Sequence, residues 1–146
     1  MSCFEDDTTE IATLVKPFTE ADGWDALENP NSPKVVVSWQ DANRQHGIAR
    51  MFSRSVIPYL RSINKSDWLQ QGKHYKHIGL YAYRAATLAA ITALPPSAAE
   101  QAESLEQLRW IENGYQIRVA TCQTQSIGID TPEDLDKANQ LLITKK

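Results

Sequence analysis

The sequence predicts an α/β fold with an antiparallel hairpin in its middle and a strand–helix ending. Runs rich in β-branched and aromatic residues recur in the first two thirds of the chain, at residues 11–18, 34–40, 48–55 and 77–83. The last third holds two helix starts, with one more strand-like run between them. Strand signals followed by alternating helix and strand signals are typical of mixed α/β domains.

The hairpin is predicted from residues 34–40 (KVVVSWQ) and 48–55 (IARMFSRS). β-branched and aromatic side chains favour extended backbone, so each run is a predicted strand. The turn-rich segment 41–47 (DANRQHG) separates them. Because so short a connection can join only antiparallel neighbours, the two strands are expected to pair as a hairpin. The polar segment 61–75 that follows is predicted to be a loop.

Helices are predicted in the second half of the chain. Residues 85–94 are alanine-rich, and the two prolines that follow end this helix. Ser97 and Glu100 form a capping box, and apolar residues at helical spacing continue to Gly114, a natural terminator. One helix is therefore expected over 97–114. After a predicted strand at 117–122, Thr131 followed by proline opens a last helix.

Composition excludes several classes of partner. The 146 residues are 42% hydrophobic and 23% charged, and the net charge is −3. These values are typical of globular domains, and the basic residues form no run, so neither nucleic acid nor an anionic membrane is expected as a partner. No apolar stretch approaches the roughly 18 residues that a membrane span needs. The acidic start has no signal-peptide character, and Cys3 and Cys122 lack metal-ligand spacing, so a cytoplasmic location is expected.

Few residues indicate chemistry by their pattern alone. The chain has neither a glycine-rich dinucleotide loop nor a Walker loop. Asp130 follows the apolar run 127–129 and directly precedes the helix start at Thr131. A carboxylate at this point of an α/β sheet could hold Mg²⁺ together with substrate phosphates. The alternative is that Asp130 only caps the helix.

Arginine and histidine side chains are the other candidates. Arg54 lies near the end of a predicted strand and Arg61 lies in the next segment, where two guanidiniums could bind a carboxylate or phosphate. His74 and His77 are three residues apart in an extended segment, so they are not expected to share a metal ion. His77 alone could hydrogen-bond a substrate hydroxyl. For all these residues an ordinary solvated surface position is the alternative.

Acidic and amide side chains lie on one face of the predicted helix at 97–114. Glu103, Glu106 and Gln107 are placed opposite Leu105 and Leu108. The simplest interpretation of this face is that it is solvated.

Five strings in register resemble one family. They occur in the chain as NPNSPKVVV (29–37), FSRSVIP (52–58), KHIGLYAYR (76–84), PPSAAEQAESLEQLRWIENG (95–114) and GIDTPEDL (128–135). In this order and at these separations they resemble the C-terminal half of CMP-KDO synthetases, which couple 3-deoxy-manno-octulosonate (KDO) to CMP from CTP. The resemblance extends from about residue 11 to the end of the chain.

The resemblance implies a fold and an assembly. The expected fold is the C-terminal part of a nucleotide-diphospho-sugar transferase-like, Rossmann-like fold with an inserted antiparallel hairpin region. Residues 1–146 would be a partial domain, the sugar-binding and dimerisation half, without the N-terminal half that carries the CTP phosphate loop. The chain is accordingly expected to form a homodimer and to be inactive alone.

The resemblance also implies a reaction, in which the 2-hydroxyl of KDO attacks the α-phosphate of CTP and pyrophosphate leaves, for lipopolysaccharide biosynthesis. Asp130 matches the Mg²⁺ ligand of the family, and together with Arg54 it is the expected catalytic residue. The residues expected to contact the substrate are Arg54, Arg61, His77, Tyr81, Glu106 and Gln107.

Two other functions stay open from the sequence. The first is a related cytidylyltransferase for another acidic sugar, of the CMP-sialic acid type, which a panel of sugar substrates would separate. The second is a non-catalytic dimerisation or sugar-binding fragment, which the missing phosphate loop favours.

Overall fold

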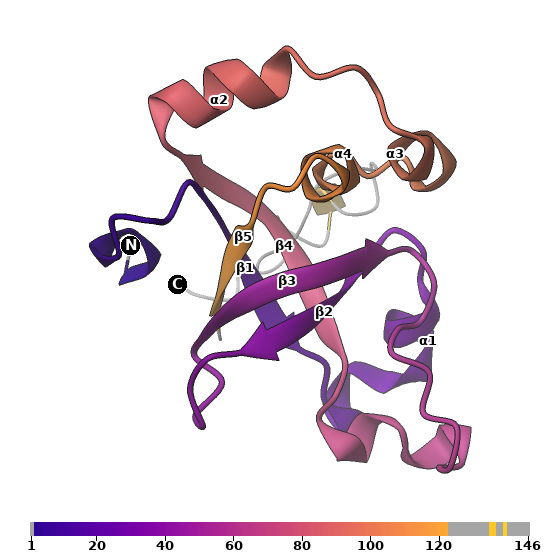
Figure 1. Ribbon diagram of the computed structural model, residues 1–146. Helices are drawn as coiled ribbons and strands as arrows, with labels where there is room; N and C mark the ends of the chain where they lie inside the picture. The colour runs from indigo at the N-terminus through magenta and orange to yellow at the C-terminus, as the bar shows by residue number, and fades with distance from the viewer. Residues whose placement is uncertain (1, 123–134, 137–138, 140–146) are drawn as a thin grey trace.

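Five strands form one sheet that closes on itself as a small barrel (Figure 1). The computed structural model describes residues 2–122, 135–136 and 139. Around the barrel the strands follow the order β1-β4-β2-β3-β5, and β5 pairs again with β1. The strands are β1 (Ile11–Pro17), β2 (Lys34–Trp39), β3 (His46–Ser53), β4 (Tyr75–Tyr83) and β5 (Ile117–Thr121).

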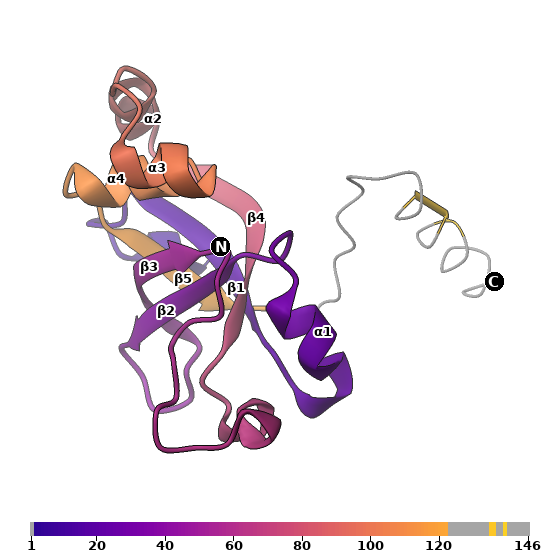
Figure 2. The ribbon, with the colours of Figure 1, turned by 90° about the vertical axis from the view of Figure 1, so that its right-hand side faces the viewer.

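Short helices surround the barrel. Figures 1 and 2 show α3 and α4 side by side next to the strands, whereas α2 stands apart from the sheet. The α-helices are α1 (Gly23–Glu28), α2 (Ala85–Thr92), α3 (Ala98–Glu103) and α4 (Gln107–Glu112). Single 3₁₀ turns occur at Ser2–Glu5, Glu20–Asp22, Lys65–Asp67 and Leu69–Gln71. No helix among the residues that the structure describes is both long and apolar enough to cross a membrane.

The predicted hairpin is confirmed. β2 and β3 pair antiparallel, with Lys34 opposite Ser53 and Trp39 opposite Gly47. Their bounds differ from the predicted strands by no more than two residues. Gly47 is required at its position, because a Cβ there would lie 2.6 Å from Cγ1 of Val37 and 2.7 Å from the carbonyl oxygen of Ser38.

The described residues do not by themselves form the sheet of a Rossmann-like fold. Such a sheet is mostly parallel with helices on both faces, whereas here β1 and β5 are the one parallel pair and the other pairs are antiparallel. The α/β class holds, with few helices. β-branched runs look alike in parallel and antiparallel strands, so the sequence could not distinguish the two arrangements.

The single helix predicted over 97–114 is wrong, because it is two helices. The capping box is present: Ser97 Oγ accepts from the Glu100 amide, and the Glu100 carboxylate accepts from the Ser97 amide. The first helix ends at Ser104, whose φ of 49° is left-handed, and α4 starts three residues later. Likewise, the predicted loop 61–75 contains two 3₁₀ turns and the start of β4.

The core fills the barrel and the space under α3 and α4. Ile11, Thr13 and Val15 alternate along β1 with their side chains buried, as expected for a strand with one face toward a core. Thr13 is the polar member of this row. Ile11 and Val15 belong to the hydrophobic core cluster, whose other members include Val35, Phe52, Ile91, Leu105, Leu108, Trp110, Ile117 and Val119.

Candidate functional site

A bulge in β4 brings two predicted site residues together. Thr13 of β1 pairs with Tyr81, but the next residue of β1, Leu14, pairs with Ile78, so two residues of β4 are left over. On a straight strand, residues four apart lie roughly 13 Å from one another at about 3.3 Å per residue. Here the ring centroids of His77 and Tyr81 are 5.3 Å apart. The bulge thus re-aims both rings into one place.

His77 is buried and neutral. Its side chain is 8% exposed, and the Phe52 ring packs edge-on against it at 5.0 Å. Its Nε2 lies 3.0 Å from the Thr13 hydroxyl. Burial disfavours the charged imidazolium and lowers the pKa of His77 to about 4. Near pH 7 this side chain therefore offers one donor nitrogen and one acceptor nitrogen.

Tyr81 holds a buried hydroxyl that has no hydrogen-bond partner among the described residues. Its ring stacks on Tyr83 at 5.7 Å and meets Trp110 of α4 edge-on at 5.2 Å. Burial first, and then the nearby Tyr83 and Glu106, raise the pKa of Tyr81. The hydroxyl therefore stays protonated and is available as a donor.

The junction between α3 and α4 supplies the remaining residues. The Glu103 carboxylate accepts from Ser53 Oγ at 2.6 Å and from the Arg54 amide at 2.8 Å, which fixes the end of α3 on the end of β3. Gln107 then opens α4 with a side chain that is 5% exposed, and its Nε2 has no partner among the described residues. The solvated alternative is therefore wrong for Gln107, and its contact with substrate stays a prediction.

Glu106 directly precedes this position and is exposed, which agrees with the solvated alternative, and its contact with substrate stays a prediction. Its carboxylate accepts from the Arg109 guanidinium at 3.1 Å. Burial first, and then the Glu106 charge, raise the pKa of Tyr83, and the same charge adds to the rise in the pKa of Tyr81 that burial causes. We call the four residues His77, Tyr81, Glu106 and Gln107 the hydroxyl-binding group, after the role that the sequence predicts for them.

This group is equipped for a polyhydroxyl ligand. Within the described residues, four buried side-chain atoms have no hydrogen-bond partner, and two of them are the Tyr81 hydroxyl and Gln107 Nε2. A buried unpaired polar group costs about 1–3 kcal/mol, so it is seldom kept without a use. A sugar hydroxyl both donates and accepts, and could satisfy these donors together with the acceptor nitrogen of His77.

Arg54 lies next to the group but is engaged elsewhere. Its guanidinium donates to three backbone carbonyls, those of Glu103 at 2.6 Å, Pro30 at 2.9 Å and Ser104 at 3.1 Å. It therefore holds the α3–α4 junction against the loop before β2. The solvated alternative is wrong for Arg54, and its contact with substrate stays a prediction.

Arg61 is not brought to the group. It is exposed in the loop between β3 and β4. The contacts of this loop are internal here: the Pro58 carbonyl lies 3.0 Å from His74 Nε2, just before β4, and Tyr59 packs on Trp68 at 5.0 Å. Tyr81 lies at the other end of that strand.

The predicted metal ligand, Asp130, lies outside the described residues, as does the helix start at Thr131. In the described part of the chain, no three His, Cys, Asp or Glu side chains are grouped so that they could hold a metal ion.

The sequence missed Thr13 and Glu103 as parts of this site. A polar residue on the inward face of a β-branched strand is the signal that could have indicated Thr13. For Glu103 no such signal existed, because its partners Ser53 and Arg54 are about fifty residues away.

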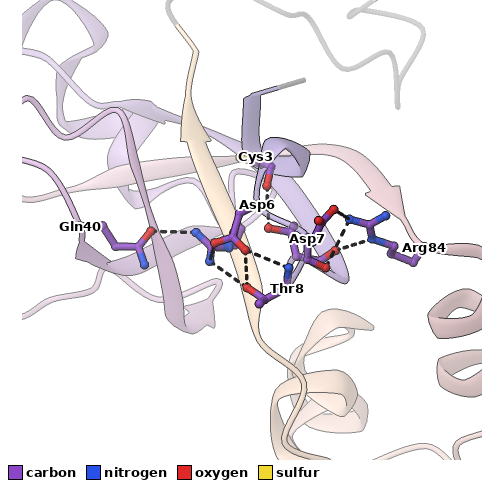
Figure 3. Close-up of polar contacts among 8 residues, drawn as sticks. Cys3, Asp6, Asp7, Thr8, Gln40 and Arg84 are labelled. Atoms are coloured by element: carbon purple, nitrogen blue, oxygen red, sulfur yellow. Dashed lines mark hydrogen bonds and ion pairs between the residues drawn. The ribbon is translucent and has the colours of Figure 1, made fainter.

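Two shallow hollows lie apart from the group, around Arg118. They are lined by different residues, among them Thr8, Glu10, Gln116 and Cys3. Figure 3 shows Asp6, Thr8 and Gln40 turned toward one guanidinium, that of Arg118. Arg84 donates to the Thr9 carbonyl at 3.0 Å nearby. These arginines tie the first ten residues to the barrel.

Known proteins resemble this chain closely. The 3-deoxy-manno-octulosonate cytidylyltransferase of Phocaeicola vulgatus is 57% identical over 141 residues, which are 97% of this chain and 54% of that protein. The protein of the same name from Polynucleobacter necessarius is 44% identical over 90% of this chain and 48% of its own length. A solved structure of CMP:2-keto-3-deoxy-manno-octonic acid synthetase complexed with CTP superposes with a TM-score of 0.80 at 36% identity, over 99% of this chain and 54% of the other.

The chain thus spans about half the length of the relatives it matches. The expected placement in their C-terminal portion is corrected. The match to the family profile begins at residue 3 and ends at residue 119, before the segment 120–146. The finding supports a chain of about half the length of its relatives that matches the family profile from residue 3 onwards. It does not support the C-terminal placement.

The family itself is shown by that profile, which is described as cytidylyltransferase and covers most of the chain. With a match over residues 3–119 and relatives of this similarity, the chain belongs to the cytidylyltransferase family.

Proposed function

We propose that this chain is the sugar-binding part of a 3-deoxy-manno-octulosonate cytidylyltransferase, and that the hydroxyl-binding group contacts KDO. The unpartnered, buried Tyr81 hydroxyl beside neutral His77 is the observation that carries this proposal. The names of the relatives support KDO and CTP as the substrates. The reaction belongs to lipopolysaccharide biosynthesis, and a cytoplasmic location is part of the proposal.

In this reaction the KDO 2-hydroxyl oxygen forms a bond to the α-phosphorus of CTP. The bond from that phosphorus to the β-phosphate breaks, pyrophosphate leaves and the hydroxyl proton is released. Such a step depends on positioning more than on covalent participation of the protein. The residues of this chain would orient the sugar: Tyr81 and Gln107 donate to its hydroxyls, and His77 and Glu106 accept from them.

We also propose that Asp130 binds Mg²⁺, because this carboxylate directly precedes the predicted helix start at Thr131 in the sequence. Arg54 and Arg61 stay proposed contacts of the acidic sugar. Because the chain has half the length of its relatives, we propose that it does not turn over alone. Pyrophosphate release from CTP and KDO by the isolated chain would contradict that part.

The variant Tyr81→Phe tests the site. It removes one hydroxyl and keeps the ring that packs on Trp110. Removing an unpaired buried hydroxyl should leave the free energy of unfolding unchanged or raise it by up to about 1 kcal/mol. KDO binding should weaken about 3- to 10-fold, the worth of one hydrogen bond between neutral groups. Both quantities are measured on the 146-residue chain, by urea unfolding and by NMR titration with KDO.

The matched control is Tyr115→Phe, which removes a hydroxyl from a residue that packs at the edge of the core outside the group. It should leave KDO binding unchanged. Equal KDO binding by wild type and Tyr81→Phe would refute the site, and stronger binding of a sialic acid than of KDO would favour the related enzyme class.

A further inference from the structure

The Thr13 side chain occupies a special position under the hydroxyl-binding group. Its Oγ1 lies 2.9 Å from the Leu80 carbonyl oxygen, 3.1 Å from the Ile78 carbonyl oxygen and 3.0 Å from His77 Nε2. Thr13 itself is 2% exposed. One hydroxyl therefore meets three partners away from solvent.

The proton count decides how these contacts are made. Carbonyl oxygens only accept, so the single hydroxyl proton of Thr13 must point to Leu80 or be shared with Ile78. The contact with His77 then needs a proton on Nε2, donated to a lone pair of Oγ1. If Nε2 were bare and took the hydroxyl proton, both carbonyl oxygens would face oxygen lone pairs at 2.9 and 3.1 Å, which is repulsive.

Because burial keeps His77 neutral, only one of its nitrogens carries a proton. With the proton on Nε2, the lone pair is on Nδ1. Among the described residues, the hydrogen bond of this ring is the one through Nε2. Nδ1 is left as an acceptor on a ring whose centroid lies 5.3 Å from that of the Tyr81 ring.

We propose that Thr13 is a positioning residue that holds His77 in the Nε2–H tautomer and so presents Nδ1 as an acceptor to a ligand hydroxyl. The same hydroxyl binds the carbonyls on both sides of Gly79 and therefore fixes the bulge that brings His77 and Tyr81 together. The role toward a sugar rests on the proposed function. The tautomer does not, because it follows from contacts inside this chain.

The tautomer is measured by long-range ¹H–¹⁵N NMR of the 146-residue chain with labelled histidine, at neutral pH and without ligand. His77→Gln identifies the His77 signals among those of the chain's histidines. Wild type and Thr13→Ser, which keeps the hydroxyl, should both show a protonated Nε2 and a bare Nδ1. Thr13→Val, which keeps the shape and loses the hydroxyl, should show a mixture of both tautomers.

Addition of KDO then tests whether the tautomer of His77 affects ligand binding. KDO should shift the Nδ1 signal in wild type and Thr13→Ser, and its affinity should fall about 3- to 10-fold in Thr13→Val. A merely structural role of Thr13 would not change the tautomer. A bare Nε2 in wild type, or an unchanged tautomer in folded Thr13→Val, would overturn the proposal. If Thr13→Val does not fold, wild type and Thr13→Ser still decide the tautomer.

The two proposals fail separately. If wild type carries the Nε2 proton, loses it partly in Thr13→Val and yet binds no KDO, the tautomer assignment stands and the proposed substrate is wrong.

Discussion

Burial determines what His77 can do in this fold. Its sequence context allowed either a surface histidine or a partner for a substrate hydroxyl, and the structure places it between Phe52 and Tyr81. The folded-state pKa of about 4 lies below the ordinary value of 6.5. The unfolded chain therefore binds more protons between these two values. Stability is full above pH 6.5 and is lost as the pH falls toward 4.

This linkage predicts an acid sensitivity that one substitution removes. Between pH 7 and pH 5, protonation of unfolded His77 should lower the free energy of unfolding by about 2 kcal/mol. His77→Gln keeps a nitrogen donor for Thr13 but does not titrate, so its loss over the same interval should be smaller by this amount. Urea unfolding at the two pH values gives the difference.

The pKa of His74 is lowered by burial as well, and its contribution is common to both proteins. The comparison therefore isolates His77. Equal pH dependence of wild type and His77→Gln would mean that His77 is not buried as described.

Only part of this site could be predicted from single residues. The resemblance indicated His77 and Tyr81, which the structure brings together. Thr13 could not be found in this way, because its role depends on a bulge in a strand more than sixty residues away. Arg54 could be predicted as a site residue, but its contacts could not, because its carbonyl partners come from two other segments of the chain.

At the scale of elements, strands were predicted more accurately than helices. Each strand carries its own signal in β-branched residues and turns, and the bounds of the β2–β3 hairpin were predicted to within two residues. The apolar pattern over 97–114 did not reveal the break at Ser104, because Leu105 and Leu108 would be buried in one helix as well as in two. The Glu103 contacts with Ser53 and Arg54 are long-range and fix the end of α3. No local pattern contains them.

Two glycines test the hairpin and the bulge as elements. Gly47→Ala should destabilise the fold by about 2–4 kcal/mol, because the new methyl group would clash with the Val37 side chain and the Ser38 backbone. Gly79→Ala, in the bulge of β4, should change stability by no more than about 0.5 kcal/mol, since nothing lies within 4 Å of its Cβ. Chemical unfolding of both variants makes the comparison, and a mild Gly47→Ala would show that β2 and β3 can separate there.

At the scale of the whole molecule, the closed sheet explains why the fold class was only partly predicted. The α/β composition is visible in the sequence, but closure depends on β5 returning to β1 after the three helices of the crossover. Closure pairs the strands all round the barrel and leaves apolar side chains on its outside. Met51 on β3 and Leu80 on β4 are 50% and 56% exposed.

The homodimer predicted from the sequence, with the hairpin at its interface, would cover exposed apolar side chains such as Met51. An apolar side chain on an exposed strand gains from burial against a second copy, whereas a charge there would be buried without a partner. We therefore expect wild type to be dimeric, and Met51→Glu to weaken the dimer at least about tenfold, a loss of roughly 1.4 kcal/mol.

Sedimentation velocity over a range of concentrations measures the dissociation constant of the dimer. Gln101→Glu on α3 adds the same charge at an exposed polar position and should leave it unchanged. A wild-type chain that stays monomeric at every concentration would rule out the homodimer. If instead Met51→Glu dimerises as tightly as wild type, the interface lies away from the hairpin.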